Sequence, residues 1–141
     1  MNNTIKLHYD VPGDDFTRAG EASSAVKKTL RKLGVPGEII RRVAIAMYEG
    51  EINMVIHGGG GAADITISPD AIIMVLSDRG PGIENLELAM REGYSTASDE
   101  VRSLGFGAGM GLPNMKKYSD TMDVFTKVGV GTTVTMRVNL S

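Results

Sequence analysis

A stripe of polar residues carries the side chains that phosphoryl chemistry needs. Glu49, Asn53 and His57 recur every four residues within 36–57, where apolar spacing predicts a helix, so they share one helix face. A carboxylate can orient or deprotonate a hydroxyl in line with a phosphate, and an amide oxygen suits Mg²⁺. Glu51 lies about 160° from this stripe and is expected at the surface. Taken alone, such a stripe is more often a solvated helix face.

A second candidate follows the apolar run 72–76, which predicts a central strand. Asp78 stands at the carboxyl end of this run, where an acid is costly unless it has a partner. Its carboxylate can accept a hydrogen bond from an exocyclic amine such as that of adenine. Gly80 and Gly82 would let the backbone approach a flat base. An ordinary turn with a solvated aspartate is the alternative, because D-x-G-x-G is a weak signal.

The third candidate is a row of alternating glycines before a predicted helix at about 109–118. They stand at Gly105, Gly107, Gly109 and Gly111. Backbone N–H groups at a helix N-terminus bind anions, which favours a phosphate site over a flexible linker. No Walker lysine follows the glycines, no strand precedes them as in a Rossmann motif, and the V-A-I-K, H-R-D and D-F-G motifs of protein kinases are absent.

The elements that must position these groups alternate between strand and helix patterns. Alternation predicts strands at 4–11 and 134–140, and the continuous apolar run predicts one at 72–76. Further strands are expected at 65–67 and 122–127, and helices at 15–33, 36–57 and 109–118. Two short turns, Ser68-Pro69-Asp70 and Gly129-Val130-Gly131, join neighbouring strands and so make these strand pairs antiparallel. We therefore expect a two-layer α/β sandwich with a mixed, mostly antiparallel sheet and helices on one face. The irregular stretch at about 83–108 is expected to be a lid over the site.

Composition fits one ordinary domain. The chain has 141 residues, 42% of them hydrophobic and 23% charged, and no cysteine, so disulfides and thiolate metal sites are excluded. No apolar run approaches the ~18 residues of a membrane span, and the N-terminus lacks signal-peptide features. We expect a single domain over 1–141 in the cytoplasm. The net charge of −2 gives no reason to expect nucleic acid.

Charge is nevertheless uneven along the chain. Six cations, Lys27, Lys28, Arg31, Lys32, Arg41 and Arg42, fall in 27–42 with one acid, Glu38. Such a run is usually a solvated helix face. The alternative is a docking surface for an acidic protein partner.

Read together, the motifs form an ordered set. The order E-x-x-x-N, D-x-G-x-G, G-x-G-x-G-x-G-L and a final G-T, over about 40–139, resembles the GHKL ATPases, the superfamily of gyrase, Hsp90, histidine-kinase catalytic domains and MutL. Within it, the helix segment 49–58 and the segment 105–113 resemble the bacterial anti-sigma-factor serine kinases and their switch-kinase relatives.

This resemblance implies a Bergerat ATP-binding fold that uses ATP and Mg²⁺, with roles for individual residues. Glu49 matches the catalytic carboxylate, Asn53 the Mg²⁺ ligand and Asp78 the adenine-binding acid. The remaining matches are Gly82 beside the base, Gly107, Gly109 and Gly111 as lid hinges, Arg102 as a lid arginine that reaches the γ-phosphate, and Thr132 as an adenine support. Thr133 stays open as an alternative to Thr132, and His57 is favoured as structural.

The resemblance implies a serine/threonine protein kinase that acts on a STAS-domain partner in an anti-sigma pathway. The alternative is an ATP-binding switch protein that sequesters a sigma factor or activates a phosphatase without essential phosphoryl transfer. A detached histidine-kinase catalytic domain is less favoured, because no helical hairpin carries a phosphoacceptor histidine and His8 lies on a predicted strand. No nucleic acid or membrane partner is expected, and a homodimer is left open.

Overall fold

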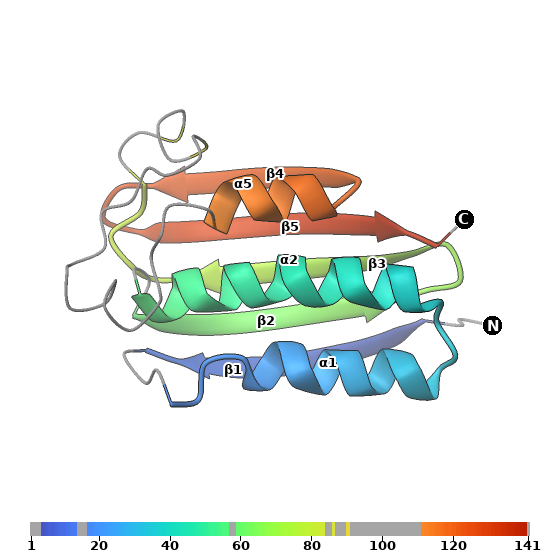
Figure 1. Ribbon diagram of the computed structural model, residues 1–141. Helices are drawn as coiled ribbons and strands as arrows, with labels where there is room; N and C mark the ends of the chain where they lie inside the picture. Colours follow the sequence, from blue (N-terminus) through green and yellow to red (C-terminus); the bar gives the residue numbers. More distant parts are fainter. Residues whose placement is uncertain are drawn as a thin grey trace.

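One sheet and one layer of helices make up the described part of the chain (Figure 1). The computed structural model describes residues 4–13, 17–56, 59–83, 86, 90 and 111–140. The elements in chain order are β1 (Ile5–Pro12), α1 (Glu21–Lys32), α2 (Gly37–Ile56), β2 (Gly60–Ile67), β3 (Ala71–Asp78), α5 (Gly111–Tyr118), β4 (Thr121–Lys127) and β5 (Gly131–Asn139). Across these residues, no helix is both long and apolar enough to cross a membrane.

The strands form a five-stranded sheet in the order β1-β2-β3-β5-β4. All four pairings between these strands are antiparallel, so the expected mixed sheet is wrong in this detail. The reason is the connection from β1 to β2. It contains two helices that run in opposite directions, so it returns the chain to the end of the sheet where β1 finished, and Pro12 pairs with Gly60.

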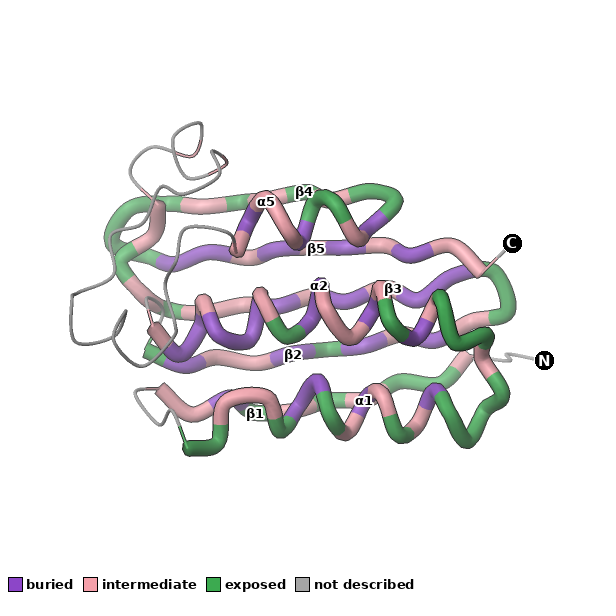
Figure 2. Tube along the Cα trace, in the orientation of Figure 1, coloured by how far each residue is buried: buried purple, intermediate pink, exposed green. Residues whose placement is uncertain are grey.

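The three helices of the described residues, α1, α2 and α5, cover the same face of the sheet, as predicted (Figure 1). Inward-facing residues of the central strands are buried beneath them, and buried and partly exposed residues alternate along these strands (Figure 2). The core under α2 contains Ile72, Met74, Leu76, Val134, Met136 and Val138. The two-layer α/β sandwich is thereby confirmed.

A glycine in the middle of α2 lets this helix lie close to its neighbours. A Cβ on Gly50 would lie 2.7 Å from Cδ2 of Leu76 and 3.3 Å from Sδ of Met115. Glycine costs about 1 kcal/mol relative to alanine inside a helix. The close packing of α2 against β3 and α5 leaves no room for a side chain at position 50, which explains why a residue unfavourable in helices stands there.

Glu51 is buried, not exposed as its helical angle suggested. Only 2% of its surface is accessible. Its carboxylate accepts hydrogen bonds from the backbone N–H groups of Gly20 (3.0 Å), Ala22 (3.1 Å) and Ser23 (3.0 Å), and from the Ser23 hydroxyl (2.9 Å). The angle correctly placed Glu51 away from Glu49, but that side of α2 faces the start of α1. Gly20 offers α1 no side-chain cap, so Glu51 binds the N–H groups that a helix leaves unpaired at its N-terminus.

Candidate functional site

The polar stripe of α2 faces the beginning of α5. Asn114, in the first turns of α5, donates a hydrogen bond from Nδ2 to Oε1 of Glu49 at 3.4 Å. A Cβ on Gly111 would lie 2.8 Å from both Oδ1 and Nδ2 of Asn53. The structure therefore brings three predicted residues together: Glu49, Asn53 and Gly111. Asn114 was missed, although its position just after the glycine row could have suggested it.

The surroundings of Glu49 change its acidity. The side chain is half-buried, and this burial raises the pKa of its carboxyl above the ordinary value. The hydrogen bond from Asn114 opposes the shift by favouring the charged form. A carboxylate whose pKa is raised holds an abstracted proton better than an exposed one, which is the property that a general base requires.

Asp78 ends β3 on the face that the helices cover. Alternation along β3 places it on the same side as Leu76, which is buried against α2. Its Oδ1 accepts hydrogen bonds from the backbone N–H groups of Gly80 (2.9 Å) and Thr132 (3.2 Å). Within the described residues, Oδ2 accepts no hydrogen bond. The carboxylate is therefore held by one oxygen and can offer the other to a ligand.

Of the two adjacent threonines, Thr132 lies beside Asp78. Thr132 is 8% exposed, and its Oγ1 lies 2.9 Å from Oγ1 of Thr126. Thr126 in turn accepts a hydrogen bond from the backbone N–H of Ile83 at 2.8 Å. Thr133 projects from the other face of the sheet, where its hydroxyl donates to Oγ of Ser77. Thr126 was missed, although its alternation with Met122 and Val124 indicated an inward position.

The glycine loop after Asp78 packs on the hairpin between β4 and β5. Gly82 has φ of 79°, and a Cβ there would lie 2.6 Å from the carbonyl oxygen of Lys127. The N–H of Gly129 donates to the Pro81 carbonyl at 2.9 Å. A glycine at 82 is thus required by the protein's own packing, a reason that the sequence did not reveal. Gly80 contributes its N–H to Asp78.

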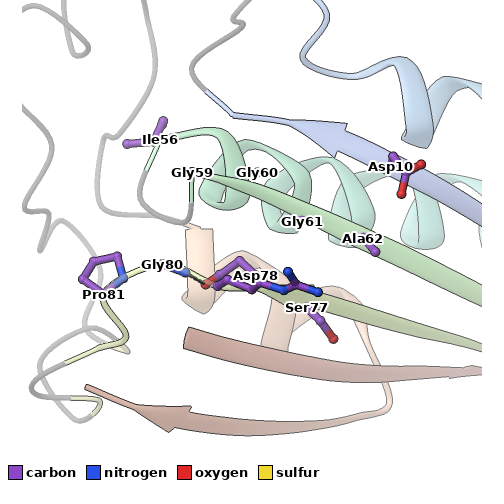
Figure 3. Close-up of a pocket in the computed structure, with 11 residues that line it drawn as sticks. Asp10, Ile56, Gly59, Gly60, Gly61, Ala62, Ser77, Asp78, Gly80 and Pro81 are labelled. Carbon is purple, nitrogen blue, oxygen red and sulfur yellow. Dashed lines mark hydrogen bonds between the residues drawn. The ribbon is translucent and has the colours of Figure 1, made fainter. Parts of the chain in front are cut away.

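A cavity of about 820 Å³ opens at the Asp78 end of the sheet (Figure 3). Its lining comes from the ends of β1, β2, β3 and α2: Asp10, Ile56, Gly59, Gly60, Gly61, Ala62, Ser77, Asp78, Arg79, Gly80 and Pro81. Small-molecule sites in proteins occupy about 300–1,000 Å³. The size suits a nucleoside, but Glu49 and Asn53 are not part of this lining. Thr132 is not part of the lining either, and Ser77 lies on the sheet face away from the helices, so the cavity meets the candidate site only at Asp78 and Gly80.

Five residues singled out from the sequence lie outside the described residues: His57, Arg102, Gly105, Gly107 and Gly109. Their roles stay predictions. Most of the lid expected at about 83–108 lies outside the described residues as well.

Comparisons with known proteins agree with the predicted resemblance. A family model described as a histidine kinase-like ATPase domain matches residues 14–138. The anti-sigma F factor of Clostridium acetobutylicum is 34% identical over 144 residues, with 97% of this chain and 94% of that protein covered. The anti-sigma F factor of Clostridium kluyveri is 30% identical over 145 residues, covering 96% of this chain and 94% of that protein.

Two solved structures share the fold. One contains the RsbU and RsbW domains of a Mycobacterium tuberculosis protein and matches with a TM-score of 0.65, 16% identity, and coverage of 95% of this chain and 32% of that one. The other is the mycobacterial sensor histidine kinase MprB, with a TM-score of 0.55, 17% identity, and coverage of 96% and 97%. At these identities the likeness concerns the fold alone.

Proposed function

Because the chain belongs to the histidine kinase-like ATPase family, together with the anti-sigma F factors, we propose that it binds Mg-ATP between α2, the Asp78 end of the sheet and the start of α5. One arrangement supports this most directly. Glu49 and Asn53 on α2 lie against α5, while Asp78 stands on the sheet face that the same helix covers.

Asp78 and Thr132 would hold the adenine. The free Oδ2 of Asp78 would accept a hydrogen bond from the exocyclic amine, while Oδ1 keeps its bonds to Gly80 and Thr132. The Thr132 hydroxyl, held by Thr126, would lie next to the base. Asp78 lines the cavity, and Thr132, which lies outside the lining, is held beside Asp78 by its backbone N–H; these two polar groups suit the polar edge of a flat heterocycle.

Asn53 would hold the Mg²⁺ ion. Magnesium keeps several waters and takes few protein ligands alongside phosphate oxygens, and the amide oxygen of Asn53 is of the right kind. Among the described residues, no group of three His, Cys, Asp or Glu side chains could hold a metal. The phosphates would lie at the N-terminus of α5, where Gly111 brings the backbone next to Asn53. Gly107, Gly109 and Arg102 remain predicted lid contacts to the phosphates.

Glu49 would serve as the base in phosphoryl transfer to a serine or threonine hydroxyl. It would accept the hydroxyl proton as that oxygen attacks the γ-phosphorus and the bond to the bridging oxygen breaks, which releases ADP. The raised pKa of Glu49 favours this role. The acceptor we propose is a STAS-domain protein of a partner-switching pathway in the cytoplasm.

The named relatives support a second candidate within the same family. They are called anti-sigma F factors, so the chain could act by sequestering a sigma factor or by activating a phosphatase, with ATP as a conformational ligand. Phosphoryl transfer would then be dispensable. Glu49 distinguishes the two candidates, because only the kinase needs its carboxylate.

Calorimetric titration tests the nucleotide site. We expect wild-type protein to bind ATP more tightly with Mg²⁺ than without it. Asp78→Asn should lower the affinity for ATP and for ADP alike, whereas Asn53→Ala should remove only the dependence of ATP affinity on Mg²⁺. No magnesium-dependent binding by a folded wild-type protein would exclude the proposal.

A transfer assay then separates the two candidates. The protein is incubated with labelled ATP and a purified STAS-domain protein. We expect label on the STAS protein, and its loss in Glu49→Ala with ATP binding retained. A Glu49→Ala variant that still sequesters its partner as wild type does would favour the switch protein instead.

A further inference from the structure

Basic residues gather at one end of the helix layer, formed by the end of α1, the beginning of α2 and the end of α5. We call this surface the basic end; it contains Lys27, Lys28, Arg31, Lys32, Arg41, Arg42, Lys116 and Lys117. These eight are more than half of the fifteen Lys and Arg in the chain. The three helix ends lie at the same side of the molecule, opposite the ends that carry Asn53, Asp78 and Gly111 (Figure 1).

Few acids offset this charge. Glu38 and Asp120 are the acids within 27–42 and 116–120, while the other fifteen of the seventeen acids lie elsewhere in the chain. Both are already engaged: Arg41 pairs with Glu38 at 3.4 Å, and Arg42 pairs with Asp120 at 3.2 Å. The four cations of α1 (Lys27, Lys28, Arg31 and Lys32) and Lys116 in α5 form no ion pair with any described residue. The basic end is thus strongly positive on a molecule whose remainder is acidic.

Apolar groups lie among these cations. Leu33, directly after α1, is 46% exposed. The ring of Tyr118 has the Arg41 guanidinium 5.6 Å and the Lys117 ammonium 5.4 Å from its centre. Arginine and tyrosine are enriched among the residues that contribute most to protein–protein affinity. An exposed leucine cannot hydrogen-bond to the phosphate backbone of a nucleic acid. The mixture favours a protein partner over nucleic acid.

We propose that the basic end docks an acidic, partly apolar segment of a protein partner. The cations attract the segment and set its orientation. Leu33 and Tyr118 contact its apolar side chains. Arg41 and Asn53 are about 18 Å apart along α2, so docking here leaves the nucleotide site uncovered. This inference goes beyond the proposed nucleotide function and does not depend on it.

Fluorescence anisotropy tests the proposal without nucleotide. The probe is a labelled peptide with Glu and Leu at helical spacing; a second peptide replaces Leu with Gly. We expect wild type to bind the Glu-Leu peptide more tightly, with affinity that falls as salt rises. The double variant Lys28→Glu/Lys32→Glu should bind roughly tenfold more weakly. Leu33→Ser should lower the affinity for the Glu-Leu peptide and leave the affinity for the Glu-Gly peptide unchanged.

The matched control is Lys6→Glu/Lys127→Glu, which makes the same charge change at exposed sites on β1 and β4. It should alter peptide affinity less than about twofold. Equal losses in both double variants would overturn the proposal, as would absent binding by wild type. Tighter binding to a short DNA duplex or to anionic lipid vesicles than to the Glu-Leu peptide would also overturn it. Mg-ATP titration of each variant separates these outcomes from a failure of the nucleotide site.

Discussion

The backbone of Gly111 lies directly against the side-chain amide of Asn53. A Cβ at 111 would be 2.8 Å from both the oxygen and the nitrogen of that amide. The residue that closes the glycine row therefore also fixes where a proposed magnesium ligand can stand. This contact joins two motifs that are 58 positions apart in the sequence.

Replacing Gly111 with alanine should displace Asn53 without unfolding the protein. We expect Mg-ATP affinity to fall about tenfold, because the metal ligand moves away from its position. Binding of magnesium-free ADP should change little. Calorimetry measures both affinities.

Gly37→Ala is the matched control, since a Cβ at Gly37 meets no atom within 4 Å. It should leave nucleotide affinity unchanged. Equal affinity of Gly111→Ala and wild type for Mg-ATP would contradict the placement of Asn53 in the metal site.

Glu51→Ala should strongly destabilise the fold. The change leaves three backbone N–H donors at the start of α1 without their acceptor, whereas the Ser23 hydroxyl keeps the Gly20 carbonyl; we expect a loss of about 3 kcal/mol in the free energy of unfolding. Urea denaturation followed by circular dichroism measures it. Glu38→Ala, at a mostly exposed position, should cost less than about 0.5 kcal/mol. Similar losses in the two variants would show that the Glu51 contacts contribute little.

Asn114→Ala should shift the pH profile of phosphoryl transfer, so that the fall in rate on the acid side begins at a higher pH. Burial raises the pKa of Glu49, and the Asn114 hydrogen bond lowers it, so removing that bond lets the pKa rise further. A base works only when ionised, so the rate falls at a higher pH than in wild type. The pH dependence of kcat/KM measures the shift. A fall on the acid side that stays in place, or moves to lower pH, would argue against Glu49 as the base.

Glu49→Gln should stabilise the protein at neutral pH while it abolishes transfer. A carboxyl whose pKa is raised in the folded state contributes stability below its unfolded pKa, and this contribution is lost as pH rises through the folded pKa. Glutamine removes the buried charge. Urea unfolding at pH 7 and at pH 4 should show the gain at pH 7 only. A gain of equal size at both values would point to a cause other than ionisation.

Thr132→Val should weaken ADP binding about fivefold, whereas Thr133→Val should not. The first change removes a hydroxyl beside Asp78, worth about 1 kcal/mol, and the second removes one on the opposite face of the sheet. The two variants have the same change in volume and polarity. A larger effect at 133 would contradict the assignment of Thr132.

The sequence alone determined the layers and the family. Periods of two and of about four residues report which side of each strand or helix is apolar, and this sufficed for a sheet covered on one face by α1, α2 and α5. The motif order singled out Glu49, Asn53 and Asp78 as candidates, because their spacing within a helix or at a strand end can be read from the sequence. The basic stretch at 27–42 was equally visible.

Only the tertiary structure decided what the polar residues contact. Glu51 meets the start of α1, Asn114 meets Glu49, and Thr132 rather than Thr133 meets Asp78; the partners are 28 or more positions apart. A helical angle gives the direction of a side chain, but it does not say whether water or another helix lies there. The two-helix return between β1 and β2 likewise made the sheet antiparallel where the strand patterns had predicted a mixed one, because strand direction depends on where the chain re-enters the sheet.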